Sequence, residues 1–129
     1  MMAVDTSALM AILLNESRAD ACIDLLAAEP DLIISAVTVG EALIVSENRG
    51  IAAEMTRLLD GVGFDVLPVT AESARRVSDA YRQWGRGRHE AGLNFGDCFA
   101  YDAAKSNDCP LLFVGDDFSK TDIRSALAV

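Results

Sequence analysis

Short apolar runs alternate with longer stretches of helical periodicity along almost the whole chain. Four runs have the length and the β-branched or apolar residues of strands: residues 2–4, 32–35, 65–69 and 111–114. Between and after them, apolar positions recur every three or four residues. This spacing predicts helices over residues 8–14, 18–29, 38–48, 51–62, 74–84 and 97–107, and a weaker one from about residue 122.

The alternation of strands and helices predicts an α/β fold, a three-layer α/β/α sandwich with a mainly parallel sheet. The strand runs are apolar on both faces, as in a sheet that helices cover on both sides. Pro68 cannot donate a ladder hydrogen bond, which places the third strand at an edge or marks its end. With 129 residues and 51% hydrophobic content, the chain has the size of a single domain, residues 1–129.

Acidic residues stand at the points where predicted strands end or helices begin. Asp5 follows the first strand, Glu41 lies one turn into the helix after the second, and Asp97 begins the last long helix. The pair Asp116 and Asp117 follows the last strand. Because ligands of parallel α/β sheets bind beyond the carboxyl ends of the strands, we expect these carboxylates to converge at one edge of the sheet.

Each acid also has an explanation that needs no chemistry. Asp5 is a good N-cap, Thr38 and Glu41 match the S/T-x-x-E capping box, and Asp97 suits a helix start because of the helix dipole. The last two acids fit an ordinary turn. These explanations weaken jointly, because several carboxylates in one place repel each other unless a cation neutralises them. Oxygen ligands of this kind favour Mg²⁺ or Mn²⁺.

The sequence therefore predicts a metal centre at Asp5, Glu41, Asp97 and Asp116, with Asp117 as the alternative fourth acid. Three polar neighbours are candidates to orient the ligands or a bound water, although helix capping and loop hydrogen bonds explain them equally well. They are Thr6, Ser7 and Asn94.

A glycine-rich basic loop follows the fifth helix. Arg82, Arg86 and Arg88 are candidates for phosphate contacts, and a solvated charged loop is the competing interpretation. His89 is the only histidine and has no suitable partner nearby in sequence, which favours an exposed loop residue.

Charge and cysteine content narrow the class of protein. The net charge of -9 and the pI near 4.4 argue against non-specific binding to a polyanion, so a nucleic-acid substrate would need a divalent metal or a basic partner. The three cysteines have no CxxC spacing and read as reduced packing residues. No apolar run is long enough for a membrane span and no signal-type start is present, so we expect a soluble cytoplasmic protein.

Several segments resemble the PIN-domain nucleases and, more narrowly, the VapC toxins of bacterial toxin–antitoxin pairs. The resemblance rests on residues 4–9 (VDTSAL), Glu41 on its helix, residues 93–98 (LNFGDC) and residues 111–122 (LLFVGDDFSKTD). They occur in the order and spacing of the family. One departure is that the family's frequent threonine before its last acid is not matched, since residues 113–115 (FVG) stand there.

This resemblance implies a PIN sandwich and a Mg²⁺-dependent endoribonuclease, with Mn²⁺ as a possible substitute, that cuts structured RNA such as a tRNA or rRNA. Asp5, Glu41 and Asp97 take the family's acidic positions, and Asp116 or Asp117 takes the fourth. It also implies a VapB-like antitoxin as partner, a homodimer, and a higher complex of toxin with antitoxin.

Other functions compete with this one. A PIN fold that only binds RNA or a partner protein is the main alternative, and the intact acidic set argues against it. A haloacid-dehalogenase-like Mg²⁺ phosphatase would need a second aspartate two residues after Asp5, where Ser7 stands. A receiver-like signalling domain would need a Lys-Pro pair after a late strand, and a dinucleotide site would need GxGxxG after a strand; neither occurs.

Overall fold

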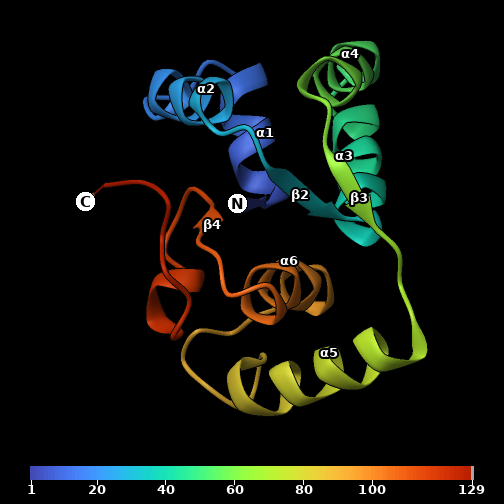
Figure 1. The fold of residues 1–129 in the computed structure, drawn as a ribbon, viewed down its shortest axis with the longest axis vertical. Helices are drawn as coiled ribbons and strands as arrows, with labels where there is room; N and C mark the ends of the chain where they lie inside the picture. Colours follow the sequence, from blue (N-terminus) through green and yellow to red (C-terminus); the bar gives the residue numbers. More distant parts are fainter. Residues whose placement is uncertain (129) are drawn as a thin grey trace.

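A parallel sheet separates two groups of helices in the computed structural model, which describes residues 1–128 (Figure 1). The elements are, in chain order, β1 (Met2–Val4), α1 (Thr6–Leu13), α2 (Ala19–Ala28), β2 (Leu32–Ser35), α3 (Ala36–Asn48), α4 (Ala52–Val62), β3 (Asp65–Leu67), α5 (Ala71–Trp84), α6 (Phe95–Ser106), β4 (Leu111–Leu112) and a 3₁₀ turn (Phe118–Lys120). Helices α1 to α4 lie on one side of the sheet, and α5 and α6 lie on the other. The predicted three-layer sandwich is confirmed.

The sheet has the order β3-β2-β1-β4, and all neighbouring strands are parallel. Alternate strand residues face opposite layers. Ala3 and Ile33 pack with α5 and α6, whereas Val4 and Ile34 pack with the helices of the other side. Strand β3 lies at an edge and ends before Pro68, as the missing N–H of proline predicts.

The end of the chain differs from the prediction. Residues 121–128 form no helix and instead run beside β4. The backbone N–H of Leu111 donates to the carbonyl of Arg124, and the N–H of Ala126 donates to the carbonyl of Leu111, at 2.9 Å each. The exposed edge of β4 needs such partners, and a helix of seven or eight residues is marginal in water, so the extended course is favoured.

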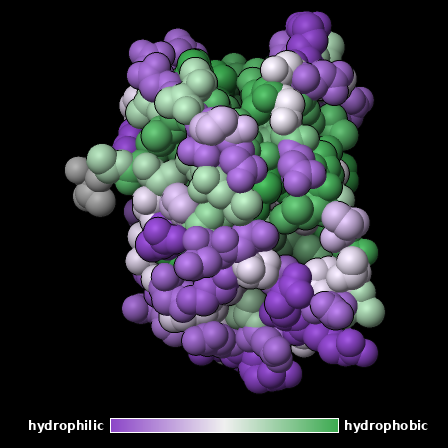
Figure 2. Space-filling model, in the orientation of Figure 1, coloured by the Kyte–Doolittle hydropathy of each residue, from purple (hydrophilic) through white to green (hydrophobic). Residues whose placement is uncertain are grey.

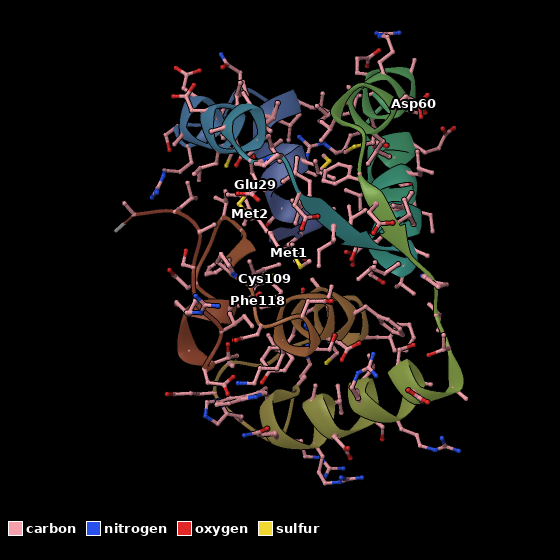
Figure 3. All side chains as sticks on the ribbon, viewed as in Figure 1. Met1, Met2, Glu29, Asp60, Cys109 and Phe118 are labelled. Atoms are coloured by element: carbon pink, nitrogen blue, oxygen red, sulfur yellow. The ribbon has the colours of Figure 1, made fainter. Side chains whose placement is uncertain are left out.

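The chain begins at the amino end of β1, an inner strand of the sheet. The α-amino group of Met1 pairs with Glu29 at 2.7 Å, close to Cys109 (Figure 3). All three cysteines are buried and free, as predicted. No helix within residues 1–128 is long and apolar enough to cross a membrane.

Candidate active site

Asp5 lies at the carboxyl end of β1, where it caps the N-terminus of α1. The backbone N–H of Ser7 donates to its Oδ2 at 3.1 Å. The carboxyl group is only 4% exposed, and Oδ1 has no hydrogen-bond partner. Capping therefore uses one oxygen and leaves the other buried and unsatisfied, which is costly unless something binds it.

Burial raises the pKa of Asp5 to about 6. Hydrogen bonding to Ser7 works in the opposite direction, while the negative charges of Asp97 and Glu41 add to the rise. Three acids from three different elements are therefore close enough to disfavour one another's ionisation.

Glu41 reaches this place from the second turn of α3. Its Oε1 accepts a hydrogen bond of 2.6 Å from the Thr6 hydroxyl, and its other oxygen packs against Gly96, where any side chain would collide with it. The competing explanation of Glu41, a capping box with Thr38, is wrong. Helix α3 begins earlier, and Ser35 caps it by accepting the N–H of Val37 at 3.2 Å. Glu41 is thus free for another role.

Asp97 is fixed by a reciprocal cap at the start of α6. Its backbone N–H donates to Asn94 Oδ1 at 2.8 Å, and its Oδ2 accepts the N–H of Asn94 at 3.0 Å. Burial raises the pKa of Asp97, as do the charges of Asp117 and Glu41, while Arg86 lowers it. The pattern N-x-x-D in the sequence carried this signal, and the helix starts two residues earlier than predicted.

The two adjacent acids after β4 have different surroundings. Asp117 is the one whose charge acts on Asp97. Asp116 borders a separate depression with Arg18 and Val114, and its carbonyl accepts hydrogen bonds from Ser119. We call Asp5, Glu41, Asp97 and Asp117 the acidic edge. Sequence alone left this choice open because both residues occupy the same exposed turn.

Ser7 ties the two sides of the acidic edge together. Its hydroxyl accepts the backbone N–H of Val114 at 3.0 Å, so the turn after β1 is held against the segment after β4. Thr6 and Asn94 each hold one of the acids, as described above. The three predicted polar neighbours therefore all make hydrogen bonds that fix the acids or their loops.

Of the three predicted basic residues, Arg86 is the one whose charge acts on an acid of this edge, Asp97. Arg82 pairs with Asp79 on the surface of α5 at 2.8 Å. Arg86 and Arg88 are exposed in the loop after α5, and within residues 1–128 neither forms an ion pair. His89 is partly buried and accepts the N–H of Ala91 at 3.0 Å, so it is a structural loop residue.

A surface pocket beside Asn94 was missed from the sequence. It has a volume of about 520 Å³ and lies between α5 and α6. Its lining includes Val77, Tyr81, Arg86, Asn94, Phe95 and Cys98. Phe95 is 69% exposed. The only signal was a phenylalanine in the first turn of a helix, and nothing in the pattern separated it from the buried Phe99.

The acidic edge has the donor chemistry of a divalent-metal site. All of its side chains offer oxygen, and Asp5 Oδ1 lacks a partner. Among the described residues, however, no three acidic, histidine or cysteine side chains are close enough to hold a metal ion by themselves. Mg²⁺ commonly takes one or two carboxylates and keeps several waters, so the residues fit a water-rich site better than a closed cage.

Comparison with known proteins gives the family. The PIN domain matches residues 2–124. The sequence is 43% identical to ribonuclease VapC42 of Mycobacterium tuberculosis, over 97% of this chain and 98% of that protein. The chain belongs to the PIN-domain family and, within it, to the VapC ribonucleases. Ribonuclease VapC30 of the same species is a further relative of this PIN-domain protein, 40% identical over 95% of each chain.

Solved structures share the fold of this PIN-domain protein. VapC20 of Mycobacterium tuberculosis, described as a sarcin–ricin loop cleaving toxin, superposes with a TM-score of 0.75 at 18% identity, over 95% of this chain and 96% of that one. A toxin–antitoxin complex from Klebsiella pneumoniae gives 0.71 at 17% identity, over 95% and 93%. At these identities the likeness concerns the fold.

Proposed function

We propose that this PIN-domain protein is the toxin of a toxin–antitoxin pair and a Mg²⁺- or Mn²⁺-dependent endoribonuclease that hydrolyses structured RNA such as a tRNA or rRNA. The observation that carries the proposal is the buried, unpartnered Oδ1 of Asp5 in the middle of an acidic edge. Within residues 1–128, no basic side chain forms an ion pair with the four acids of this edge. The names of similar proteins, ribonuclease and sarcin–ricin loop cleaving toxin, support the same activity.

In this proposal Asp5 and Asp97 would hold the metal directly, and Glu41 and Asp117 would act through water or at a second ion. The chemistry supplied by a bound divalent ion would be a lowered pKa of water and positive charge that stabilises the phosphate in the transition state. The backbone N–H groups of Ser7 and Asn94 hold the Oδ2 atoms of Asp5 and Asp97, which leaves the two Oδ1 atoms for the ion. Thr6 keeps the Glu41 carboxylate turned towards them.

Asp116 is the less favoured fourth acid. It lies in the same turn as Asp117, but its neighbours belong to the depression near Arg18. We therefore propose Asp117 for the role, and comparison of Asp116→Asn with Asp117→Asn tests this choice. Equal losses of cleavage would mean that the turn rearranges when metal binds.

The attacking group in this mechanism is water, so neither a protein nucleophile nor the 2′-hydroxyl of the RNA is required. The products should carry 5′-phosphate and 3′-hydroxyl ends. Cleavage of total tRNA and rRNA by the purified protein, with Mg²⁺, Mn²⁺ or EDTA, tests the activity. We expect metal-dependent cuts that are lost in Asp97→Asn. Products with 2′,3′-cyclic phosphates, or cuts that persist in EDTA, would contradict the mechanism.

We further propose a VapB-like antitoxin partner and a homodimer. An antitoxin that places arginine or lysine at the acidic edge would complement a chain with a net charge of -9 and compete with the metal. The complex from Klebsiella pneumoniae supports such a partner. Apolar side chains exposed on α3, including Ile44 at 65%, are candidates for the dimer interface. Light scattering at high protein concentration tests the dimer, and a strictly monomeric chain would refute it.

A further inference from the structure

The pocket beside Asn94 has a use that the cleavage mechanism does not assign. We call it the aromatic pocket, formed by Val77, Tyr81, Arg86, Asn94, Phe95 and Cys98. Its volume of about 520 Å³ lies within the usual range of small-molecule sites. It touches the acidic edge through Asn94, whose side chain and backbone hold Asp97.

Phe95 is placed to stack with a planar group. Its ring is 69% exposed, which makes it the most exposed large hydrophobic side chain among the described residues. The Phe99 ring supports it edge-on, with ring centroids 5.0 Å apart. Exposure of this size costs solvation free energy, and a bound aromatic group would recover it.

The other wall of the aromatic pocket is held rigidly. The Tyr81 hydroxyl donates to the carbonyl of Arg86 at 3.2 Å. The N–H of Arg86 donates to the carbonyl of Leu93, and the N–H of Leu93 donates to the carbonyl of Trp84, at 3.0 Å each. This double connection fixes the loop immediately before Asn94, so a ligand would bind a pocket that is already formed.

Positive charge concentrated near the aromatic pocket favours a ligand that carries phosphates. Five of the eleven lysine and arginine residues lie within residues 75–88, although the whole chain is strongly acidic. Arg76 and Arg82 are paired with Asp102 and Asp79. Arg86 lines the pocket and is close enough to Asp97 to lower its pKa. An apolar side chain of a protein partner would need no such cation, whereas a base flanked by phosphates would.

We propose that the aromatic pocket binds one unpaired base of the RNA, preferably a purine, stacked on Phe95 beside Tyr81, with Arg86 at the adjacent phosphate. This inference rests on the proposed ribonuclease function. The bound base would set the distance between an unstacked nucleotide and the cut, because Asn94 borders both the pocket and the acidic edge. The pocket is therefore a specificity subsite, and it explains a preference for loops over duplex RNA.

Binding of short RNAs that differ only in their bases tests the proposal. The probes are fluorescein-labelled oligoadenylate and oligouridylate 12-mers and an abasic ribose-phosphate 12-mer of equal charge. The protein carries Asp97→Asn so that RNA stays intact in Mg²⁺. We expect Phe95→Ala to weaken oligoadenylate binding by about tenfold or more, to weaken oligouridylate binding less, and to leave abasic binding unchanged. Phe95→Trp should retain the affinity.

The controls separate this site from the rest of the molecule. Val66→Ala removes another exposed apolar side chain, on β3, and should leave all three affinities unchanged. Arg86→Ala should weaken binding of all three probes, because it removes a phosphate contact. The inference is overturned if Phe95→Ala binds oligoadenylate as well as its parent, or if it loses affinity for the abasic probe equally. A protein side chain then becomes the favoured occupant of the pocket.

Failure of the inference and failure of the proposed function give different results. The chain with Asp97 intact is assayed in parallel for cleavage of total RNA in Mg²⁺. Cleavage together with an unaffected Phe95→Ala variant would remove only the base subsite. Absence of cleavage under every metal would remove the ribonuclease proposal, and base-dependent binding would then stand as the property of an RNA-binding module.

Discussion

Two carboxylates that contact opposite parts of α6, Asp97 and Asp122, have pKa values shifted in opposite directions. At the N-terminal end, Asp97 lies among other acids, and burial and their charges raise its pKa. Beyond the C-terminal end, burial also opposes ionisation of Asp122, but hydrogen bonds from Lys105 and Tyr101 outweigh it and lower the pKa. Asp122 has a paired cation. Asp5, Glu41 and Asp97 accept hydrogen bonds from uncharged groups only and have no paired cation within the described residues, which is the arrangement expected where an external cation binds.

The same contrast is seen at the surface. Figure 2 shows hydrophilic side chains gathered over α5, where Arg76 pairs with Asp102 at 2.7 Å and most charges are solvated or paired. The acidic edge has no such pairing within the described residues. The predictions below test whether this difference reflects function.

The largest expected effect is the loss of RNA cleavage when an acid of the acidic edge is replaced. Asp5→Asn and Asp97→Asn should each lower the rate of RNA cleavage by at least about 100-fold, since changes to groups that merely orient metal ligands already cost about 10- to 100-fold. The matched control is Asp122→Asn, which removes a paired acid and should retain cleavage. Rates are measured at saturating Mg²⁺, and an equal loss in the control would remove the distinction.

The next effect is on stability and has a defined pH dependence. The pKa of Asp5 is about 6 in the folded chain, above about 3.9 when unfolded. The Asp5 carboxyl group therefore stays protonated up to a higher pH in the folded state than in the unfolded state. The metal-free protein should lose about 3 kcal/mol of unfolding free energy as the pH rises from about 4 to above 6. Asp5→Asn has no charge to bury, so it should be more stable than the unmodified protein at pH 8 and not at pH 4.

Urea unfolding in EDTA at both pH values measures this difference. Added Mg²⁺ should stabilise the unmodified protein at pH 8 by mass action and should have little effect on Asp5→Asn. If Asp5→Asn increases the free energy of unfolding equally at pH 4 and pH 8, its effect comes from packing and not from the charge of Asp5.

Disturbing a paired acid should lower the free energy of unfolding, whereas Asp5→Asn should raise it at pH 8. Arg76→Ala leaves Asp102, whose side chain is 11% exposed, without its cation, and should lower the unfolding free energy by about 2 kcal/mol. This loss is smaller than the loss expected for a fully buried ion pair, because the Arg76 side chain is 45% exposed. The double variant Arg76→Ala, Asp102→Asn should recover part of the loss. A single variant as stable as the unmodified protein would refute a structural role for this pair.

The smallest effect concerns the hydrogen bond that orients Glu41. Thr6→Val keeps the shape of the side chain and removes the 2.6 Å bond to Glu41 Oε1. We expect about tenfold weaker activation by Mg²⁺, with the maximal rate changed less. Titration of cleavage against Mg²⁺ separates these two quantities. A lower maximal rate at unchanged metal dependence would assign Thr6 to the reaction itself.

Part of the site was predictable because two of its acids stand at the boundaries of predicted elements. Asp5 and Asp97 are placed by local signals, a strand end and a helix start, that sequence reveals. Glu41 was harder, because its role depends on Thr6, which lies 35 residues away. Choosing between Asp116 and Asp117 requires the course of a turn, which residue types alone do not determine.

The prediction of the fold was also right where local sequence decides the structure and wrong where contacts between distant residues decide it. The strands and long helices follow from hydrophobic periodicity, which is a local property. Residues 121–128 contain good helix formers, but the backbone groups of Leu111 recruit them as an extended partner. Exposure of Phe95 also depends on what packs around it, and neighbouring Phe99, four residues later, is buried.

The bond between Ser7 and the N–H of Val114 has a consequence for how the protein is made. It joins parts of the chain 107 residues apart, and β1 pairs with β4 beside it. During translation, the first acid leaves the ribosome long before Asp117 does, so an unfinished chain has no complete centre. A nascent toxin would therefore stay harmless to the RNAs around it, including those of the ribosome that is synthesising it, until almost its entire length has emerged.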